Sequence, residues 1–184
     1  MRSNCMSESV GVVHGRFQPF HNGHMEYVLA ALEQCSFLLV GITQFDRSGI
    51  DPGSPEHRLN SEQNPFLYWE RTLMISEALR TAGVPQDRYA FVPFPISEPS
   101  RIRQIVPANA VMYTTVYDDW NREKISRLRD VGFDVRILWE RSMKTVEGME
   151  VRKALASGGL SKISGMVPDG VVDALRRIEG MKSQ

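Results

Sequence analysis

The stretch VGVVHGRFQPFHNGHMEYVLAALEQCSFLLVGI, residues 10–42, decides the fold class. Its first residues, 10–13, are apolar and predict a buried strand. Apolar side chains then recur at helical spacing from Met25 to Leu32, and a second apolar run at 37–42 predicts another buried strand. A strand, turn, helix and strand at this spacing form a βαβ unit with parallel strands and a right-handed crossover.

The rest of the chain repeats this alternation of strands and helices. Short apolar runs predict three more strands, at 89–94, 110–115 and 135–138. Further helices are expected from Pro65 to about Ala82, from Asp118 or Asp119 to Gly132, at about 149–156, and from Asp169 onward. Because the strands are apolar on both faces, we predict an α/β fold: a parallel sheet of about five strands with helices on both faces.

A single domain is expected over residues 10–182, preceded by a flexible N-terminal tail at 1–9. The connection at 43–63 is polar, rich in Gly, Pro, Ser and Asn, and long for a compact domain. Because connections of this kind are commonly functional, we expect this segment to form a lid that orders over a ligand.

The composition excludes several classes of function. Lys plus Arg and Asp plus Glu are balanced at 22 each, which argues against a general binder of nucleic acid or anionic membranes. No segment approaches the roughly 20 apolar residues of a membrane span, and the first ten residues hold no apolar run typical of a signal peptide. The two cysteines, Cys5 and Cys35, do not form a disulfide framework, so we expect a cytoplasmic enzyme in a reducing compartment.

The turn after the first predicted strand carries the chemistry. His21 and His24 are separated by Asn-Gly directly before the amphipathic helix, and Gly15 and Gly23 allow the backbone to approach a ligand closely. The helix N-terminus presents unpaired N–H groups, and its dipole favours anions. With Arg16 as a further donor, this turn is suited to binding phosphate at the carboxyl end of a strand, where such sheets bind ligands.

Residues 15–24, GRFQPFHNGH, resemble the signature of the HxGH nucleotidylyltransferase superfamily and are similar to nicotinamide-mononucleotide (NMN) adenylyltransferases of the archaeal type. The similarity extends along most of the chain. It includes Asn64-Pro65-Phe66 with Glu70-Arg71, then Gly148, Glu150, Val151 and Arg152 of a Ser-Gly-Thr-x-Val-Arg motif, and Val167-Pro168 with Val171.

This resemblance implies a Rossmann-like nucleotidylyltransferase fold, in which an acceptor's phosphoryl oxygen attacks the α-phosphorus of a nucleoside triphosphate in line and pyrophosphate leaves. Such a reaction depends on positioning and charge stabilisation. Mg²⁺ is expected as a cofactor that arrives with the triphosphate, because the sequence offers no dedicated carboxylate cage. The residues implied as catalytic are His21, His24 and Arg16, and those implied as nucleotide-binding are Gly15, Phe17, Gln18, Gly23, Gly148, Met149 and Arg152.

The chain departs from the family pattern in two places. Glu147 and Met149 stand where the family has Ser and Thr, and the Glu147 carboxylate would repel phosphates unless it points away or meets a cation. Residues 113–120 replace the family's Ser-Gly-Asn-Pro loop after the fourth strand. The candidate acceptor-binding residues are Arg101, Arg103, Tyr113, Thr114, Trp120 and Lys144.

Three functions stay open at this point. The first is transfer of a nucleoside monophosphate from ATP or CTP to a phosphate or phosphonate acceptor, with NMN adenylyltransferase as the nearest relative. The alternative is a cytidylyltransferase that moves CMP from CTP to a small phosphonate or phosphate in specialised metabolism. The third is a non-catalytic nucleotide-binding module. The expected partners are the nucleotide, the small acceptor and further copies of the chain in a homo-oligomer, with no nucleic acid and no membrane.

Three further residues admit more than one interpretation. His14 is either a buried histidine with its hydrogen bonds satisfied or a ligand contact. Trp120 either stacks on a base or caps the core. Arg71 is expected to pair with Glu70 on a helix face, with a binding role as the alternative.

Overall fold

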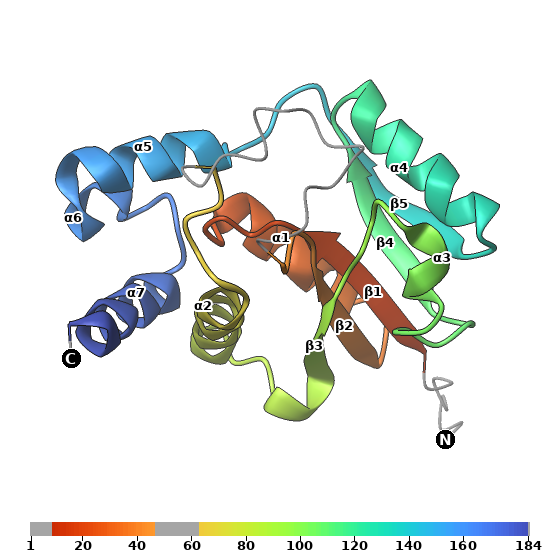
Figure 1. The fold of residues 1–184 in the computed structure, drawn as a ribbon, viewed down its shortest axis with the longest axis horizontal. Coiled ribbons are helices and arrows are strands. Elements are labelled where there is room, and N and C mark those ends of the chain that lie inside the picture. Colours follow the sequence, from red (N-terminus) through yellow and green to blue (C-terminus); the bar gives the residue numbers. More distant parts are fainter. Residues whose placement is uncertain (1–8, 47–62, 184) are drawn as a thin grey trace, which may run out of the picture.

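The computed structural model describes residues 9–46 and 63–183. The tail predicted at 1–9, apart from Ser9, and most of the lid predicted at 43–63 therefore lie outside the described residues. Within the described ranges, strands and helices alternate along the chain as the sequence predicts (Figure 1).

The described strands form one sheet in the order β3-β2-β1-β4-β5, and every neighbouring pair is parallel. This arrangement confirms the predicted α/β fold with a five-stranded parallel sheet. The strands are β1 (Val10–Gly15), β2 (Phe37–Ile42), β3 (Tyr89–Pro93), β4 (Val111–Val116) and β5 (Asp134–Glu140).

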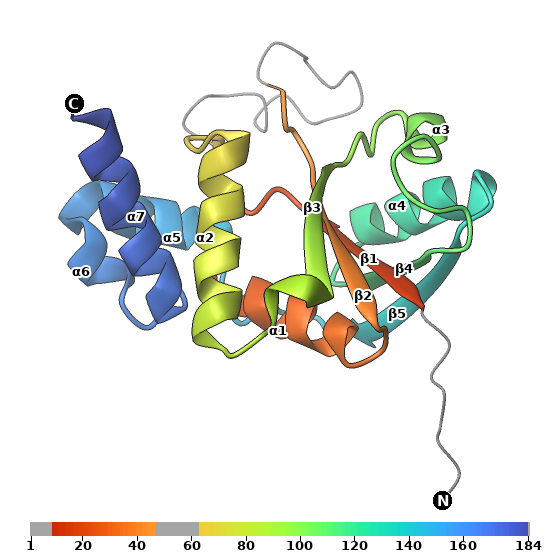
Figure 2. The ribbon, with the colours of Figure 1, turned by 90° about the horizontal axis from the view of Figure 1, so that it is seen from below.

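Helices cover both faces of the sheet (Figure 1 and Figure 2). One face is covered by α1 and α2, with α5, α6 and α7 beyond them, and the other face by α3 and α4. No helix in the described ranges is long and apolar enough to cross a membrane. The helices are α1 (Asn22–Leu32), α2 (Tyr68–Thr81), the 3₁₀ turn η3 (Gln86–Arg88), α3 (Pro99–Ile102), α4 (Asp119–Asp130), α5 (Gly148–Gly158), α6 (Leu160–Ile163) and α7 (Asp169–Lys182).

The strand side chains alternate between two cores. Val13 and Val40 are fully buried in the core that includes residues of α1, α2 and α7. Val12 and Leu39 point to the opposite face and pack with residues of α3 and α4. Because both faces are covered, the strands appear in the sequence as continuous apolar runs rather than as alternating patterns.

Helix α2 begins at Tyr68, so the prediction of a helix start at Pro65 is wrong. The peptide groups of Phe66 are used elsewhere: its N–H donates to Gln18 Oε1 and its carbonyl accepts from Gln18 Nε2, both at 2.9 Å. The Glu70 carboxylate then accepts the Leu67 N–H at 2.6 Å and begins the helix. The Gln18 side chain, which is distant in the sequence, therefore delays the start of the helix by three residues relative to the start predicted from Pro65.

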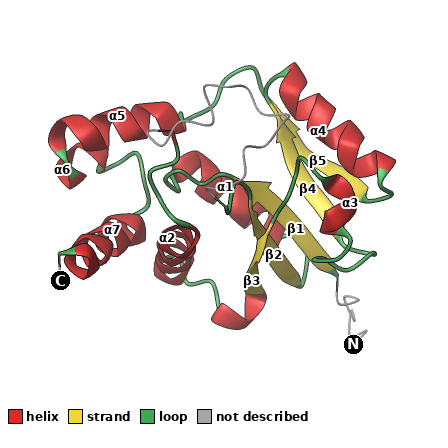
Figure 3. Ribbon diagram, viewed as in Figure 1, coloured by secondary structure: helices red, strands yellow, loops and turns green. Residues whose placement is uncertain are grey.

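The order of the strands indicates where on the sheet a ligand is expected to bind. The chain passes from β1 to β2 and β3 on one side, and then returns to place β4 on the other side of β1. In open parallel sheets, ligands bind outside the carboxyl ends of the strands at this point of reversal. Figure 3 shows the loops that leave the strand ends, among them the turn between β1 and α1.

Candidate active site

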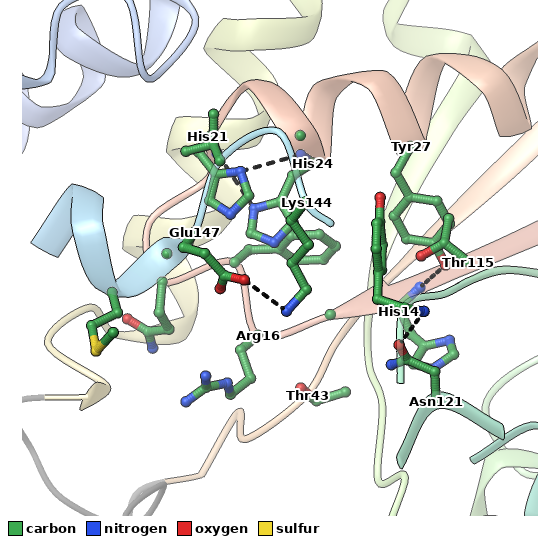
Figure 4. Close-up of a pocket in the computed structure, with 18 of the residues that line it drawn as sticks. His14, Arg16, His21, His24, Tyr27, Thr43, Thr115, Asn121, Lys144 and Glu147 are labelled. Carbon is green, nitrogen blue, oxygen red and sulfur yellow. Dashed lines mark hydrogen bonds and ion pairs between the residues drawn. The ribbon is translucent and has the colours of Figure 1, made fainter. Parts of the chain in front are cut away.

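A cavity of about 420 Å³ lies at the carboxyl ends of β1 and β4 (Figure 4). Its wall is formed by the turn before α1, the first turns of α4, the loop at 141–147 and the start of α5. The fold thus brings together segments that are more than a hundred residues apart in the chain. The predicted residues that line the cavity are Gly15, Arg16, Phe17, Gln18, His21, Gly23, His24, Trp120, Lys144, Gly148, Met149 and Arg152.

His21 and His24 form a stacked pair at the start of α1. The ring centroids lie 3.6 Å apart, and the planes are 20° from parallel. Nδ1 of His21 accepts the backbone N–H of His24, and Nδ1 of His24 accepts the backbone N–H of His21, each at 3.4 Å. Since Nδ1 acts as the acceptor in both rings, the proton of each neutral ring is on Nε2, which is therefore a hydrogen-bond donor. The His24 ring also interacts with the backbone of Pro19.

Burial keeps both imidazoles neutral. It lowers the pKa of His21 to about 4, and the charges of Lys144 and Arg152 act in the same direction. The pKa of His24 lies well below its usual value because of burial first, and then because of His21, Arg16 and Lys144. The same cations that oppose a charge on the rings would attract phosphate groups placed beside them.

The buried side chains of Phe17 and Gln18 pack against this turn and hold it in place. The Phe17 side chain is buried, and its ring meets the His24 ring edge-on at 5.0 Å between centroids. Gln18 is also buried, and its amide is occupied by the peptide groups of Phe66. Both residues line the cavity. The Gln18 amide, however, already makes hydrogen bonds through its oxygen and its nitrogen to the loop before α2.

Arg152 joins α5 to the turn. Its Nη1 donates to the Gln18 carbonyl at 2.7 Å, and its Nη2 donates to Gln63 Oε1. Gly148 leaves the space that the guanidinium occupies, since a Cβ at that position would lie 3.3 Å from Arg152 Nη1 and 3.8 Å from His21 Nε2. A small residue at 148 therefore allows the arginine to reach the histidine pair.

Glu147 meets a cation inside the cavity. Its Oε1 lies 3.4 Å from Lys144 Nζ, so the carboxylate that would repel phosphates is paired with the ammonium group of the same loop. Met149 lines the rim and is 49% exposed, and it offers no hydrogen-bond donor where the family has Thr. The departures from the family motif thus change the charge and polarity of this wall.

Arg71 is buried next to the site and binds the backbone of two loops. Its Nη1 donates to the carbonyls of Arg16 and Thr43 at 2.8 Å each, and its Nη2 donates to the Gln44 carbonyl at 2.9 Å. The expectation of a charge pair with Glu70 on the helix face is wrong, because Glu70 is also buried and binds Lys182 at 2.5 Å. Arg71 instead ties the loop after β1 to the loop after β2.

Two of the predicted acceptor-binding arginines do not reach the cavity. Arg101 is exposed and pairs with Glu98 at 3.0 Å. Arg103 donates to the Val131 carbonyl and lies over the Phe133 ring, next to the amino end of β5. The reason is that the chain after β3 folds into α3, whose buried Ile102 faces the core and turns both arginines outward.

Tyr113 and Thr114 do not line the cavity either. Strand β4 continues to Val116, so both residues lie within the sheet and the loop begins only at Tyr117. The Tyr113 side chain is buried beneath α1, and its hydroxyl donates to the Gln34 carbonyl at 3.1 Å. The structure therefore does not bring these two predicted acceptor-binding side chains to the cavity.

Other side chains line the cavity that the sequence analysis did not single out. Lys124 and Arg127 follow Trp120 on one face of α4, and their charged groups lie 5.5 and 5.3 Å from its ring centroid. The spacing of four and three residues on a helix is the signal that could have found them. The additional lining residues include Tyr27, Thr43, Thr115, Tyr117 and Asn121, and His14, for which a ligand contact was one of two interpretations, lines the cavity as well.

The chain matches known proteins over most of its length. The family described as cytidylyltransferase-like matches residues 12–157. A phosphonoformate cytidylyltransferase from Streptomyces viridochromogenes is 45% identical over 150 residues, which cover 80% of this chain and 81% of that protein. A nicotinamide-nucleotide adenylyltransferase from Archaeoglobus fulgidus is 29% identical over 180 residues, which cover 91% of each chain.

A solved structure supports the fold. The bifunctional NMN adenylyltransferase/ADP ribose pyrophosphatase from Francisella tularensis superimposes with a TM-score of 0.61 at 21% identity. The match covers 82% of this chain and 43% of that one, so the present chain spans less than half of the bifunctional protein. These matches confirm the Rossmann-like fold and favour an enzyme over a non-catalytic module. The chain therefore belongs to the cytidylyltransferase-like family of HxGH proteins, and it is a nucleotidylyltransferase of the adenylyl- or cytidylyl-transferring type.

Proposed function

We propose that this enzyme transfers CMP from CTP to a small phosphonate acceptor, with phosphonoformate as the leading candidate, and releases pyrophosphate. The observation that carries the proposal is the 45% identity to a phosphonoformate cytidylyltransferase over 80% of the chain. The cavity supports it, because the described lining residues include Arg16, Lys124, Arg127, Lys144 and Arg152 against only Asp118 and Glu147. Such an excess of positive charge suits a triphosphate together with a small anionic acceptor.

In this proposal an ionised phosphonate oxygen of the acceptor attacks the α-phosphorus of CTP. The new P–O bond forms as the bond to the bridging oxygen breaks, and the electron pair leaves with pyrophosphate, so no general base is needed. His21 and His24 donate hydrogen bonds from Nε2 to phosphate oxygens on which negative charge develops. Arg16, Arg152 and Lys144 hold the leaving phosphates, and no side chain becomes covalently attached.

Mg²⁺ fits the site as an ion held mainly by the nucleotide. Among the described residues there is no group of three or more His, Cys, Asp or Glu side chains that could hold a metal. The ion would take its ligands from triphosphate oxygens and water, and it would neutralise charge on the leaving pyrophosphate. The chain's own contribution would be the cations and imidazoles that orient the loaded nucleotide.

ATP and NMN are the second candidate pair. This pair is favoured by archaeal nicotinamide-nucleotide adenylyltransferases, such as that of Archaeoglobus fulgidus, which match 91% of the chain. NMN fits the cavity less well, because its nicotinamide ring is cationic and the wall of the cavity already carries the positive charges of Lys124 and Arg127.

The test is release of pyrophosphate by the full chain with Mg²⁺ and each of ATP, CTP, GTP and UTP, against phosphonoformate, methylphosphonate and NMN. We expect turnover with CTP and phosphonoformate that exceeds every other pair by about tenfold or more in kcat/KM, a difference of roughly 1.4 kcal/mol. Comparable or faster turnover with ATP and NMN would make the second candidate correct.

A further inference from the structure

One corner of the cavity lies apart from the histidine pair. His14, Thr115 and Asn121 gather at the ends of β1 and β4 and the start of α4, while His21, His24, Lys144 and Glu147 lie on the other side (Figure 4). The phosphate chemistry proposed above uses His21, His24 and Lys144 of the second group, together with Arg16 and Arg152, and none of the three residues of this corner. The corner opens into the same cavity, and its side chains are therefore placed to meet another part of a bound substrate.

His14 brings an unsatisfied polar atom into this corner. Its ring stacks on Phe94, with centroids 4.7 Å apart and planes 14° from parallel, and its backbone N–H donates to the Tyr27 hydroxyl at 3.2 Å. Nδ1 is buried and has no hydrogen-bond partner among the described residues. A buried polar atom without a partner is costly, so such an atom at a ligand cavity points to a bond that a ligand completes.

Lys124 lines the same cavity from α4, one turn after Asn121 of the corner, and its ammonium group lies 5.5 Å from the centroid of the Trp120 ring. Burial first, and then the charge of Lys124, lower the pKa of His14 to about 3. His14 is therefore a neutral hydrogen-bonding group in a cavity that also holds this cation. Arg127, one turn further along, pairs with Glu123 at 2.6 Å, so part of its charge is already balanced.

We infer that His14 and Lys124 form the subsite for a second anionic group of the acceptor, a carboxylate that lies next to the reacting phosphonate. The inference rests on the proposed function, since a carboxyphosphonate such as phosphonoformate carries these two groups. The Lys124 ammonium group forms a charge-assisted hydrogen bond to the carboxylate, and the His14 ring donates a second bond. His14 lies two residues before Arg16, so the two anionic groups are held by neighbouring parts of one turn.

The experiment compares two acceptors of nearly equal shape. Acetylphosphonate has a methyl group in place of the charged oxygen of phosphonoformate, and it keeps the phosphonate. Kinetics at saturating CTP are measured for the wild type, Lys124→Met, His14→Leu and His14→Asn, with KI replacing KM for an acceptor that binds without turnover. The control is Arg122→Met, which changes an exposed residue of the same helix that pairs with Glu140 outside the cavity.

Lys124→Met is expected to raise KM for phosphonoformate by about tenfold or more. KM or KI for acetylphosphonate, and KM for CTP, should each change less than about twofold. His14→Leu should act in the same direction, and His14→Asn should recover much of the loss because its amide supplies a polar atom near the Nδ1 position. Arg122→Met should resemble the wild type with both acceptors.

Equal effects of Lys124→Met on both acceptors, or no effect on either, would overturn the subsite while leaving the proposed function intact. A wild-type enzyme that releases no pyrophosphate from CTP with either phosphonate would overturn the proposed function, and the subsite with it. Melting temperatures of the variants show whether a loss comes from unfolding, and Lys124→Met tests the subsite even where a His14 variant folds poorly.

Discussion

The ring of His21 stacks on the ring of His24 with centroids 3.6 Å apart, and each Nδ1 accepts the backbone N–H of the other residue. The two contacts form a reciprocal cap at the start of α1. One arrangement therefore begins the helix and fixes both rings with Nε2 as the donor. The turn that carries the two histidines and the helix that follows it are consequently specified by the same two side chains.

Removing either Nε2 donor should slow the reaction without unfolding the protein. For His24→Ala and His21→Asn we expect kcat to fall by about 10²- to 10³-fold, because a donor to developing negative charge is worth that much in comparable sites. Asn at position 21 keeps an N-cap side chain, so its effect separates catalysis from helix capping. The measurement is pyrophosphate release at saturating substrates, together with thermal melting. A His21→Asn enzyme with wild-type kcat would show that the ring serves only as a cap.

The pairing of Glu147 with Lys144 should limit the affinity for nucleotide. Glu147→Gln removes the charge that faces the expected phosphates, so KM for CTP should fall by about two- to fivefold, with the larger change at low ionic strength. The pair is 48% and 40% exposed, which predicts almost no change in melting temperature. Glu150→Gln, an exposed change one turn along that lies outside the cavity, is the matched control. A rise in KM would instead mean that the Glu147 carboxylate itself binds substrate.

Three neutral histidines should make the fold sensitive to acid. Burial lowers the pKa of His14 to about 3 and that of His21 to about 4, and it holds the pKa of His24 well below its usual value. In the unfolded chain these rings titrate near ~6.5, so below that pH the unfolded state binds protons that the folded state does not. Stability is therefore complete above about pH 6.5 and is lost as the pH falls toward 4, with a slope of up to ~1.4 kcal/mol per pH unit for each ring.

Urea unfolding at about pH 7.5, 6 and 5 measures this dependence. The His14→Gln variant lacks one of the three rings and should lose less stability over the same range. An unfolding free energy that does not change between these pH values would show that the rings are protonated in the folded protein.

Helix α7 packs against α2 through a glycine, and the two helices lie side by side in Figure 2. A Cβ at Gly170 would overlap the backbone carbonyl of Glu77, so Gly170→Ala should destabilise the protein by about 1–3 kcal/mol. Gly180 lies in the same helix, where a Cβ would meet no described neighbouring atom within 4 Å, and Gly180→Ala should be neutral or stabilise by up to ~1 kcal/mol. Urea unfolding of both variants checks the contrast. Similar values for the two would mean that α7 does not pack on α2 in solution.

The positions of the strands and of the turn with His21 and His24 could be predicted because their signals are local. A run such as 37–42 is apolar whatever surrounds it, and GRFQPFHNGH lies between a strand and a helix in the sequence itself. The start of α2 was misplaced because the Gln18 amide captures the peptide groups of Phe66, 48 residues away. The short helices α3 and α6 were missed because four residues are too few to display a helical period.

The sequence by itself determined the class of chemistry, since His21, Gly23 and His24 are contiguous with the strand and helix that orient them. Only the tertiary structure decided which other charges meet that turn. It buries Arg71 under the loops after β1 and β2, turns Arg103 toward the far end of the sheet, and places Lys124 and His14 on the wall of one cavity. The reason is that periodicity tells which face of an element is buried, whereas the partner of that face depends on how segments distant in the chain pack together.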